Sequence, residues 1–518
     1  MDHVPGGVMH SAFRVAAASI VVAAASFAIR ADVTPPSQAA EIQLQLGDLL
    51  FSEGKYLDSL AAYRNALNVA PSDGLRRPRM GVIASALRVA EFVLARDEAE
   101  KLYQADPKAP DAMTLYGDAL WSSGLFQEAE TKYHDALGVA PALARGHHGM
   151  AKALAARSRL DEALNEGQMA LRLSPRDLEI HHTVGTIFER QHRYEEAAAA
   201  YSNYVNLLPN KDHSEKADWS RAEIRFLRSF GQRVPFESDA GTEDRIYTVD
   251  FRLVNEKVVV RAKVNDAAAQ DFVVDTGSEN TVITRPTAQR LGITPITYTL
   301  SAGVGRAGLR GLQLARIDSL ELGSLKLRNV PCLIKNPPLR DIPVKETEGL
   351  SPIALGYSMV IDYKTHKLTF GKHLPEEPKD FELPMRLHRL ATVRGTVDGN
   401  HQANFVVDTG GEVISISQAT ATSLNKPETG RRIALKVYGT SGWDPDAFLM
   451  PGVDLLFDTI SYKNFPVVVL NLNAPSALLG FQLGGIVGHK WVSRGSLLPE
   501  LTPKPYALTP DSVRRQKS

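Results

Sequence analysis

Cysteine is almost absent from this chain of 518 residues, since Cys332 is the only one. A single thiol cannot form an intrachain disulfide, and no Cys-x-x-Cys pair is present to hold a metal or to act in redox chemistry. An excess of either charge is also lacking, because 59 Lys and Arg residues balance 59 Asp and Glu residues. This balance gives no argument for a nucleic-acid partner or an anionic membrane. The composition, 44% hydrophobic and 23% charged, is that of an ordinary globular protein.

A long apolar run lies near the N-terminus, from Val15 to Ile29. Arg14 precedes it and small residues follow it before Asp32, which is the anatomy of a secretory signal peptide. The run is short for a membrane-spanning helix, so an uncleaved anchor is the competing interpretation. In either case residues 1–31 predict a secreted or periplasmic protein, attached to a membrane only if this segment is not removed.

Residues 39–230 have a helical pattern that repeats. Prolines recur along this region, the last four of them 34 residues apart: Pro71, Pro107, Pro141, Pro175 and Pro209. Small residues lie twelve positions before each proline: Ser59, Ala95, Ala129, Ala163 and Ala197. A period of 34 residues, with small residues where two helices cross and a proline after the second helix, resembles the tetratricopeptide repeat. The resemblance implies a solenoid whose concave surface binds a peptide or protein partner, although a spacer or a dimerisation module is the alternative.

The pattern changes after the repeats. Residues 231–244 combine Pro, Gly and charge and predict a linker. Beyond them apolar and polar residues alternate, as is typical of β-strands, and residues 245–374 share their plan with residues 385–495. We therefore predict a multidomain protein, in which an all-α solenoid precedes an all-β, two-lobed barrel domain formed by duplication. The Pro-rich, basic residues 496–518 are predicted to be a disordered tail.

The letters FVVDTG occur twice, at Phe272–Gly277 and Phe405–Gly410, in matching places of the two lobes. One Asp-Thr-Gly could be a simple turn after a buried strand, but two copies in an internal repeat are a specific signal. An apolar strand running into Asp-Thr-Gly, with a later "IDYKTHKLTF", resembles the retropepsin-like and pepsin-like aspartic proteases. The whole chain thus resembles a bacterial aspartyl protease family protein with N-terminal tetratricopeptide repeats.

The resemblance implies an aspartic-type endopeptidase that hydrolyses peptide bonds of a polypeptide substrate. Asp275 and Asp408 would form the catalytic pair, one as general base on a water molecule and the other as general acid. Two carboxylates about 3 Å apart cannot both ionise, as aspartic proteases themselves illustrate, so the pair shares a proton. Water and two acids suffice for this chemistry, so the prediction includes neither a cofactor nor a metal.

Supporting residues follow from the same resemblance. Thr276 and Thr409 would lock the two loops together through hydroxyl-to-backbone hydrogen bonds. Gly277 and Gly410 would let the backbone turn tightly and donate N–H groups toward the carboxylates. Ser278 supplies the usual hydroxyl beside the first carboxylate.

A flap over the cleft is expected from each lobe. The glycine-rich "TLSAGVGRAGLRG" contains Gly303 and Gly305 and follows a predicted strand, as a mobile flap would. Its Gly-x-Gly-x-x-Gly spacing does not indicate a dinucleotide site, because no helix follows it. The counterpart "KVYGTSGWDPDAF" offers Tyr438 and Trp443 as substrate-facing aromatic residues.

Three departures from the family pattern leave alternatives open. Gly411 stands where the first lobe has a serine, and "EGLSPIALG" matches the expected apolar-apolar-Gly segment of the first lobe imperfectly. The second lobe also lacks a recognisable closing strand pair. One alternative is therefore an inactive peptide-binding protein with a protease-like fold. Another is a homodimeric protease that uses only the first lobe.

Overall fold

The computed structural model describes most of the chain. The described residues are 36–242, 244–305, 309–335, 347–376, 381–424, 433–439, 441–489, 496–499 and 512–516. The predicted signal or anchor segment, residues 1–31, lies outside them. In the part of the chain that the structure describes, every helix is too short or too polar to cross a bilayer.

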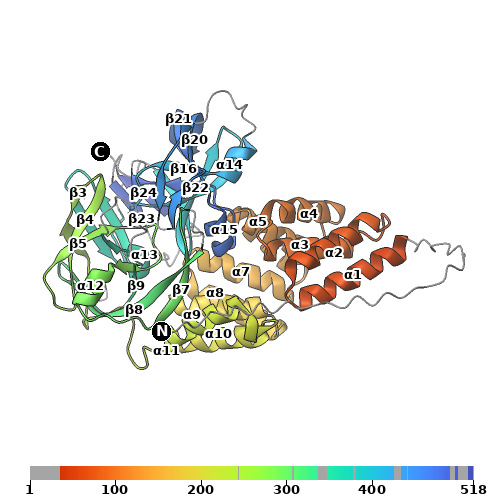
Figure 1. Ribbon diagram of the computed structural model, residues 1–518, viewed down its shortest axis with the longest axis horizontal. Coiled ribbons are helices and arrows are strands. Elements are labelled where there is room, and N and C mark those ends of the chain that lie inside the picture. The colour runs from red at the N-terminus through yellow and green to blue at the C-terminus, as the bar shows by residue number, and fades with distance from the viewer. Residues whose placement is uncertain are drawn as a thin grey trace, which may run out of the picture.

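The N-terminal region is an array of antiparallel helix pairs closed by one further helix (Figure 1). Its helices are α1 (Pro36–Ser52), α2 (Tyr56–Val69), α3 (Arg76–Arg88), α4 (Phe92–Ala105), α5 (Pro110–Ser122), α6 (Phe126–Val139), α7 (Ala144–Ala156), α8 (Leu160–Leu173), α9 (Leu178–Arg190), α10 (Tyr194–Leu207) and α11 (Glu215–Arg228). These pairs confirm the predicted all-α solenoid.

A glycine–tyrosine contact recurs within the repeats. The Tyr133 ring lies against Gly117, where a Cβ would come within 2.6 Å of the ring. Tyr201 has the same relation to Gly185, at the same 2.6 Å. Only glycine lets the two helices of a repeat approach this closely, so the tyrosine and the glycine recur together.

The array is curved enough that its two ends meet. The Asn210 side chain after α10 donates a hydrogen bond to the Glu53 carbonyl after α1, at 2.9 Å. Arg88 of α3 forms an ion pair with Glu179 of α9. These two contacts join early repeats of the array to its last repeat.

Two β lobes follow, and their strands are ordered alike. In the first lobe the order is β9-β6-β10-β5-β4-β8, and β8 returns to pair with β9. In the second the order is β21-β16-β22-β15-β14-β20, and β20 pairs with β21. Each lobe is therefore a closed six-stranded barrel, which confirms the predicted duplication.

The bounds of these elements are as follows. The first lobe contains β1 (Glu237–Ser238), β3 (Arg252–Val254), β4 (Lys257–Val264), β5 (Gln270–Val274), β6 (Thr281–Ile283), α12 (Arg285–Arg290), β7 (Thr297–Ala302), β8 (Leu309–Leu322), β9 (Leu325–Ile334), β10 (Glu348–Leu350) and α13 (Pro352–Leu355). The second contains β14 (Leu390–Val397), β15 (His401–Val407), β16 (Ile414–Ser417), α14 (Gln418–Ser423), β17 (Ile433–Ala434), β18 (Val437–Gly439), β19 (Gly442–Asp444), β20 (Phe448–Phe457), β21 (Ile460–Leu470), α15 (Asn473–Leu479) and β22 (Gly485–Val487). Strand β1, inside the predicted linker, pairs with β9.

Six strands join the lobes and continue the sheet of the second lobe through β14, and they correct two predictions. Their order is β2 (Tyr247–Asp250), β12 (Lys367–Gly371), β11 (Ser358–Asp362), β23 (Ser496–Pro499), β24 (Ser512–Gln516) and β13 (Phe381–His388). Residues 496–518 were predicted to be disordered and the second lobe to lack closing strands, yet β23 and β24 are the counterparts of β11 and β12. These two short strands are defined by their main-chain pairing with β11 and β13. Their Pro-rich, basic composition is not typical of strands, and the sequence therefore did not predict them.

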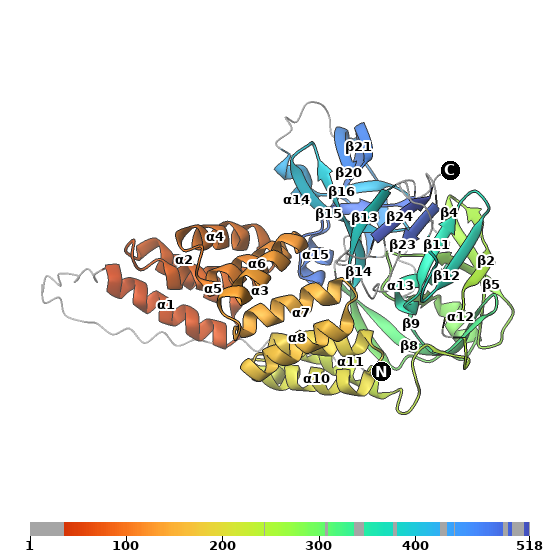
Figure 2. The same cartoon turned by 180° about the vertical axis from the view of Figure 1, so that it is seen from behind.

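The array lies beside both lobes (Figure 2). Buried apolar side chains of the helices pack against side chains of each lobe. The Phe126 ring of α6 lies 5.0 Å from the Phe481 ring of the second lobe. Phe230, just after α11, belongs to a buried cluster with Leu314 and Leu333 of the first lobe. The helices and the lobes thus share hydrophobic cores.

Candidate active site

The two Asp-Thr-Gly loops lie at the ends of buried strands. Strand β5 runs into Asp275 and β15 runs into Asp408. The Asp275 amide donates to the Leu350 carbonyl at 2.9 Å, and the Asp408 amide donates to the Val487 carbonyl at 3.0 Å. Neighbouring parallel strands therefore fix both aspartates from behind.

The segment "EGLSPIALG" of the first lobe matches the apolar-apolar-Gly pattern imperfectly, but it lies beside the Asp275 loop as the pattern predicts. In β10 Leu350 is paired with Val274, as Val487 of β22 is paired with Val407. Ser351 then stands where the second lobe has a glycine. Its hydroxyl donates to the Ser278 carbonyl at 2.5 Å, so a buried side chain supports the loop from this position.

Four hydrogen bonds cross between the loops, and they are related by a pseudo-twofold axis. The Thr276 hydroxyl donates to the Val407 carbonyl and the Thr409 hydroxyl to the Val274 carbonyl, both at 2.6 Å. The Thr276 amide donates to the Thr409 hydroxyl at 3.1 Å, and the reverse bond measures 3.0 Å. Both threonines are buried, so the bonds are shielded from water and fix one loop against the other.

The carboxyl groups of Asp275 and Asp408 face each other across this lock. A Cβ placed on Gly277 would lie 2.5 Å from Cγ of Asp408, and one on Gly410 would lie 2.7 Å from Cγ of Asp275. Each glycine therefore makes room for the opposite carboxyl group. The two carboxyl groups interact directly.

The surroundings of the two acids differ. Burial and the charge of Asp408 raise the pKa of Asp275 to about 7. Burial also raises the pKa of Asp408, but the N–H groups of Gly411 and Gly410 oppose that rise, each donating to Oδ1 at 2.9 Å. Asp275 accepts the corresponding bond from Gly277, also at 2.9 Å. Two amide donors therefore favour the ionised form of Asp408, whereas Asp275 accepts only one such bond.

The residues after the motifs differ from the expected pattern. The Ser278 hydroxyl was expected beside the first carboxylate, but it donates to the Asn280 carbonyl at 2.8 Å. Gly411 has no hydroxyl, yet its backbone N–H supplies a donor to Asp408. This main-chain donor has no sequence signal.

The two expected flaps contact each other. The Gly303 amide donates to the Ser441 hydroxyl at 3.1 Å, and the Ser441 amide donates to the Val304 carbonyl at 3.0 Å. Gly305 has φ +135°, where a Cβ would lie 2.3 Å from the Ser441 carbonyl carbon, so only glycine fits. Ser441 is thus a site residue that the sequence did not reveal, because its partner lies in the other lobe.

Tyr438 and Trp443 lie opposite each other on the β18–β19 hairpin. Their side chains are 38% and 42% exposed. The hairpin therefore presents two aromatic surfaces to solvent. Ser441 at its tip is hydrogen-bonded to Gly303 and Val304 of the flap of the first lobe.

Comparisons with known proteins support this description. Residues 260–359 and 393–485 match the family model described as aspartyl protease, and residues 80–147 match the tetratricopeptide repeat model. The family models therefore identify aspartyl protease segments in both lobes and tetratricopeptide repeats in the array. No curated protein matches the chain.

Several solved structures are similar to part of the chain. A thermophilic TPR protein of Thermus thermophilus is 20% identical, with a TM-score of 0.31, and covers 36% of this chain and 98% of its own. PilF of Pseudomonas aeruginosa is 16% identical, with a TM-score of 0.27, over 38% and 94%. MamA of Desulfovibrio magneticus is 17% identical, with a TM-score of 0.25, over 34% and 98%.

Proposed function

We propose that the protein is an extracytoplasmic aspartic-type endopeptidase whose helical array binds a protein substrate or partner. The observation that carries this proposal is the pair of buried carboxyl groups held face to face by the crossed threonine bonds. Aspartyl protease family matches in both lobes support it. The apolar N-terminal run supports the extracytoplasmic location, which N-terminal sequencing of the mature protein would check.

The geometry assigns a role to each acid. Asp408, the better supported carboxylate, takes a proton from a water molecule as the water oxygen attacks the peptide carbonyl carbon. Asp275 gives its proton to the carbonyl oxygen, which yields a neutral tetrahedral intermediate. When the C–N bond breaks, the nitrogen receives the proton held by Asp408 and the carboxylic acid product forms. At the same time one hydroxyl of the intermediate gives its proton to Asp275 and becomes the carbonyl group of the acid product, so the pair is again in its starting protonation state.

The direct test is cleavage of an unfolded polypeptide by the purified protein. Asp275→Asn and Asp408→Asn should each abolish cleavage, because either change removes one of two required proton-transfer groups. Asp271→Asn is the matched control, since Asp271 lies on the same strand β5 but pairs with Arg252 at the surface. Activity that survives both dyad substitutions would reject the proposal.

The homodimer alternative predicts a different pattern. If two first lobes paired, Asp408→Asn would be nearly silent while Asp275→Asn would not. The structure favours the single-chain pair, because Thr409 already occupies the position that a second Thr276 would need. The inactive-binder alternative predicts peptide binding without turnover by the wild-type protein.

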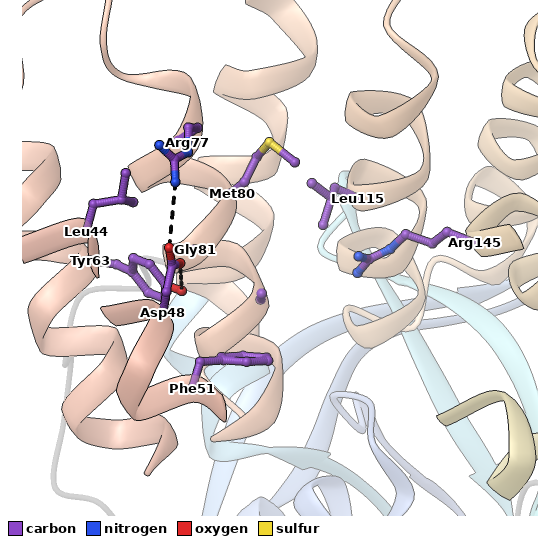
Figure 3. A pocket seen from close by; sticks show the side chains of 10 residues that line it. Leu44, Asp48, Phe51, Tyr63, Arg77, Met80, Gly81, Leu115 and Arg145 are labelled. Atoms are coloured by element: carbon purple, nitrogen blue, oxygen red, sulfur yellow. Dashed lines mark hydrogen bonds and ion pairs between the residues drawn. The ribbon is translucent and has the colours of Figure 1, made fainter. Parts of the chain in front are cut away.

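The array offers a candidate binding pocket of about 280 Å³ (Figure 3). The pocket is lined from α1, α2, α3, α5 and α7 by Leu44, Asp48, Phe51, Tyr63, Arg77, Met80, Gly81, Ala84, Leu115 and Arg145. Asp48 neutralises Arg77 at 3.6 Å, and Asp118 neutralises Arg145 at 2.6 Å. The apolar residues therefore dominate, and we propose that they accept an apolar side chain of an extended or unfolded protein.

A substitution in this pocket separates recruitment from chemistry. Met80→Glu should raise the KM for an unfolded protein and leave the KM for a short peptide unchanged, because only the long substrate reaches the array. Met169→Glu on α8 is the control, since Met169 lies outside the pocket. A KM for the unfolded protein that stays at the wild-type value in Met80→Glu would remove this pocket from substrate binding.

A further inference from the structure

Arg389 occupies an unusual position in the chain. It is the single residue between β13 and β14, whose flanking residues His388 and Leu390 pair with each other. Its φ of 60° lies in the left-handed region, which glycine or asparagine adopts more readily. An arginine retained in such a conformation points to a role for its side chain.

The Arg389 side chain reaches the active-site loop of the first lobe. Its Nε donates to Oε2 of Glu279 at 2.8 Å, and its Nη1 donates to the Leu478 carbonyl at 3.4 Å. Glu279 follows Asp275 by four positions in the same loop. One guanidinium from the second lobe therefore fixes the end of the loop that carries Asp275.

The helical array holds the same turn from the other side. Arg190 of α9 donates to the Leu387 carbonyl at 3.3 Å, and the Trp121 ring of α5 lies 5.6 Å from the His388 ring. Glu189 of α9 is close enough to Arg389 to interact electrostatically. Its carboxylate is fixed in turn by the Tyr201 hydroxyl at 2.7 Å. The array thus restrains the turn that restrains the loop.

We propose that Arg389 is a positioning residue for the Asp275 loop. We also propose that the array contributes to catalysis, because its contacts hold the β13–β14 turn that carries Arg389. This inference rests on the proposed protease function. If the array only recruited substrate, it would not affect the cleavage of short peptides that cannot reach the pocket of Figure 3. The positioning role predicts that contacts of the array do affect the cleavage of such peptides.

The matched control is Arg394, another arginine of the second lobe. It pairs with Glu128 of the array at 2.5 Å, and the two side chains are 38% and 39% exposed. The Arg389–Glu279 side chains are 33% and 31% exposed. Both pairs join parts of the molecule that are distant in sequence, but Arg394 does not contact the Asp275 loop.

The experiment compares full-length Arg389→Ala, Arg389→Lys and Arg394→Ala on a short peptide. Arg389→Ala should lower kcat by about 100-fold with little change in KM, because small misplacement of a reacting group has effects of that size. Its pH profile should shift as the two carboxyl groups change their separation. Arg389→Lys should restore part of kcat, and Arg394→Ala should stay near wild type.

Hydrogen exchange provides a readout that does not need activity. Residues 276–280 should exchange faster in Arg389→Ala than in Arg394→Ala, while exchange in the barrel strands stays unchanged and shows that the protein is folded. Equal loss of kcat in both alanine variants, or unchanged exchange in the loop, would overturn the positioning role. A wild-type protein that cleaves nothing would overturn the proposed function instead, and the exchange contrast would still decide whether Arg389 orders the loop.

Discussion

The two active-site loops begin with the same six residues, yet their surroundings differ. The crossed threonine bonds match within 0.1 Å between the loops. Beyond the motif, Glu279 is paired with Arg389 at 2.8 Å beside the array, whereas its counterpart Glu412 is 3.9 Å from Lys257 and 58% exposed. Duplication has thus supplied a symmetric scaffold, and the residues around it make the two acids chemically distinct. One acid can hold the proton because the other is better supported as an anion.

The largest loss of activity should come from substitutions of the glycines in the two Asp-Thr-Gly motifs, where the loops are alike. Gly277→Ala and Gly410→Ala would each place a Cβ within 2.5–2.7 Å of the opposite carboxyl carbon. The carboxyl groups must move apart, so kcat should fall by about 100-fold or more in both variants. Peptide cleavage measured side by side would show it. A loss confined to one variant would mean that the two loops are not equivalent scaffolds.

The crossed threonines should contribute equally to stability. Thr276→Ala and Thr409→Ala each leave a buried amide and a buried carbonyl without their partner. Each substitution should lower the free energy of unfolding by about 2–6 kcal/mol, since each of the two lost buried partners costs about 1–3 kcal/mol. Urea unfolding of the two variants would measure this. Serine at either position keeps the hydroxyl and should restore most of the stability.

The pKa of Asp275 predicts a pH-dependent asymmetry. Its ordinary value is 3.8 and its value in the folded protein is about 7. Between these values the folded state keeps a proton that the unfolded state has lost, so stability falls as the pH rises through this window. Asp275→Asn removes the titration and should raise the Tm relative to wild type by a few degrees at pH 7.5, but much less at pH 4.

Thermal unfolding at both pH values would measure the difference, with Asp408→Asn as the comparison. We expect a smaller rise in Tm at pH 7.5 for Asp408→Asn than for Asp275→Asn, because two amide donors already stabilise the Asp408 carboxylate. The same titration predicts that activity declines as the pH rises through about 7, since the general acid is then lost. A Tm gain that is the same at pH 4 and pH 7.5 would contradict the raised pKa.

Local patterns in the sequence were sufficient to predict the helical array and the two barrel lobes. The 34-residue spacing predicted the helical array, and the repeated FVVDTG predicted two like lobes whose aspartates the structure brings together. The sheet that joins the lobes was not predictable, because β23 and β24 are defined by main-chain bonds to β11 and β13 rather than by composition. Arg389 was missed for a similar reason. Its partner Glu279 is 110 residues away, and a charged residue in a turn is usually on the surface.

The smallest loss of activity should come from a substitution at Ser278, where the first loop has a serine and the second has Gly411. Ser278→Gly makes the first loop match Gly411 of the second. The family pattern places the Ser278 hydroxyl beside the carboxyl group of Asp275, but in the structure it donates to the Asn280 carbonyl. The structure therefore predicts a fall in kcat of only about threefold, from loosening of the loop, with an unchanged pH profile. A shift of that profile would show that the hydroxyl turns toward Asp275 when substrate binds, and the asymmetry between the acids would then depend on Ser278 as well as on the amide of Gly411.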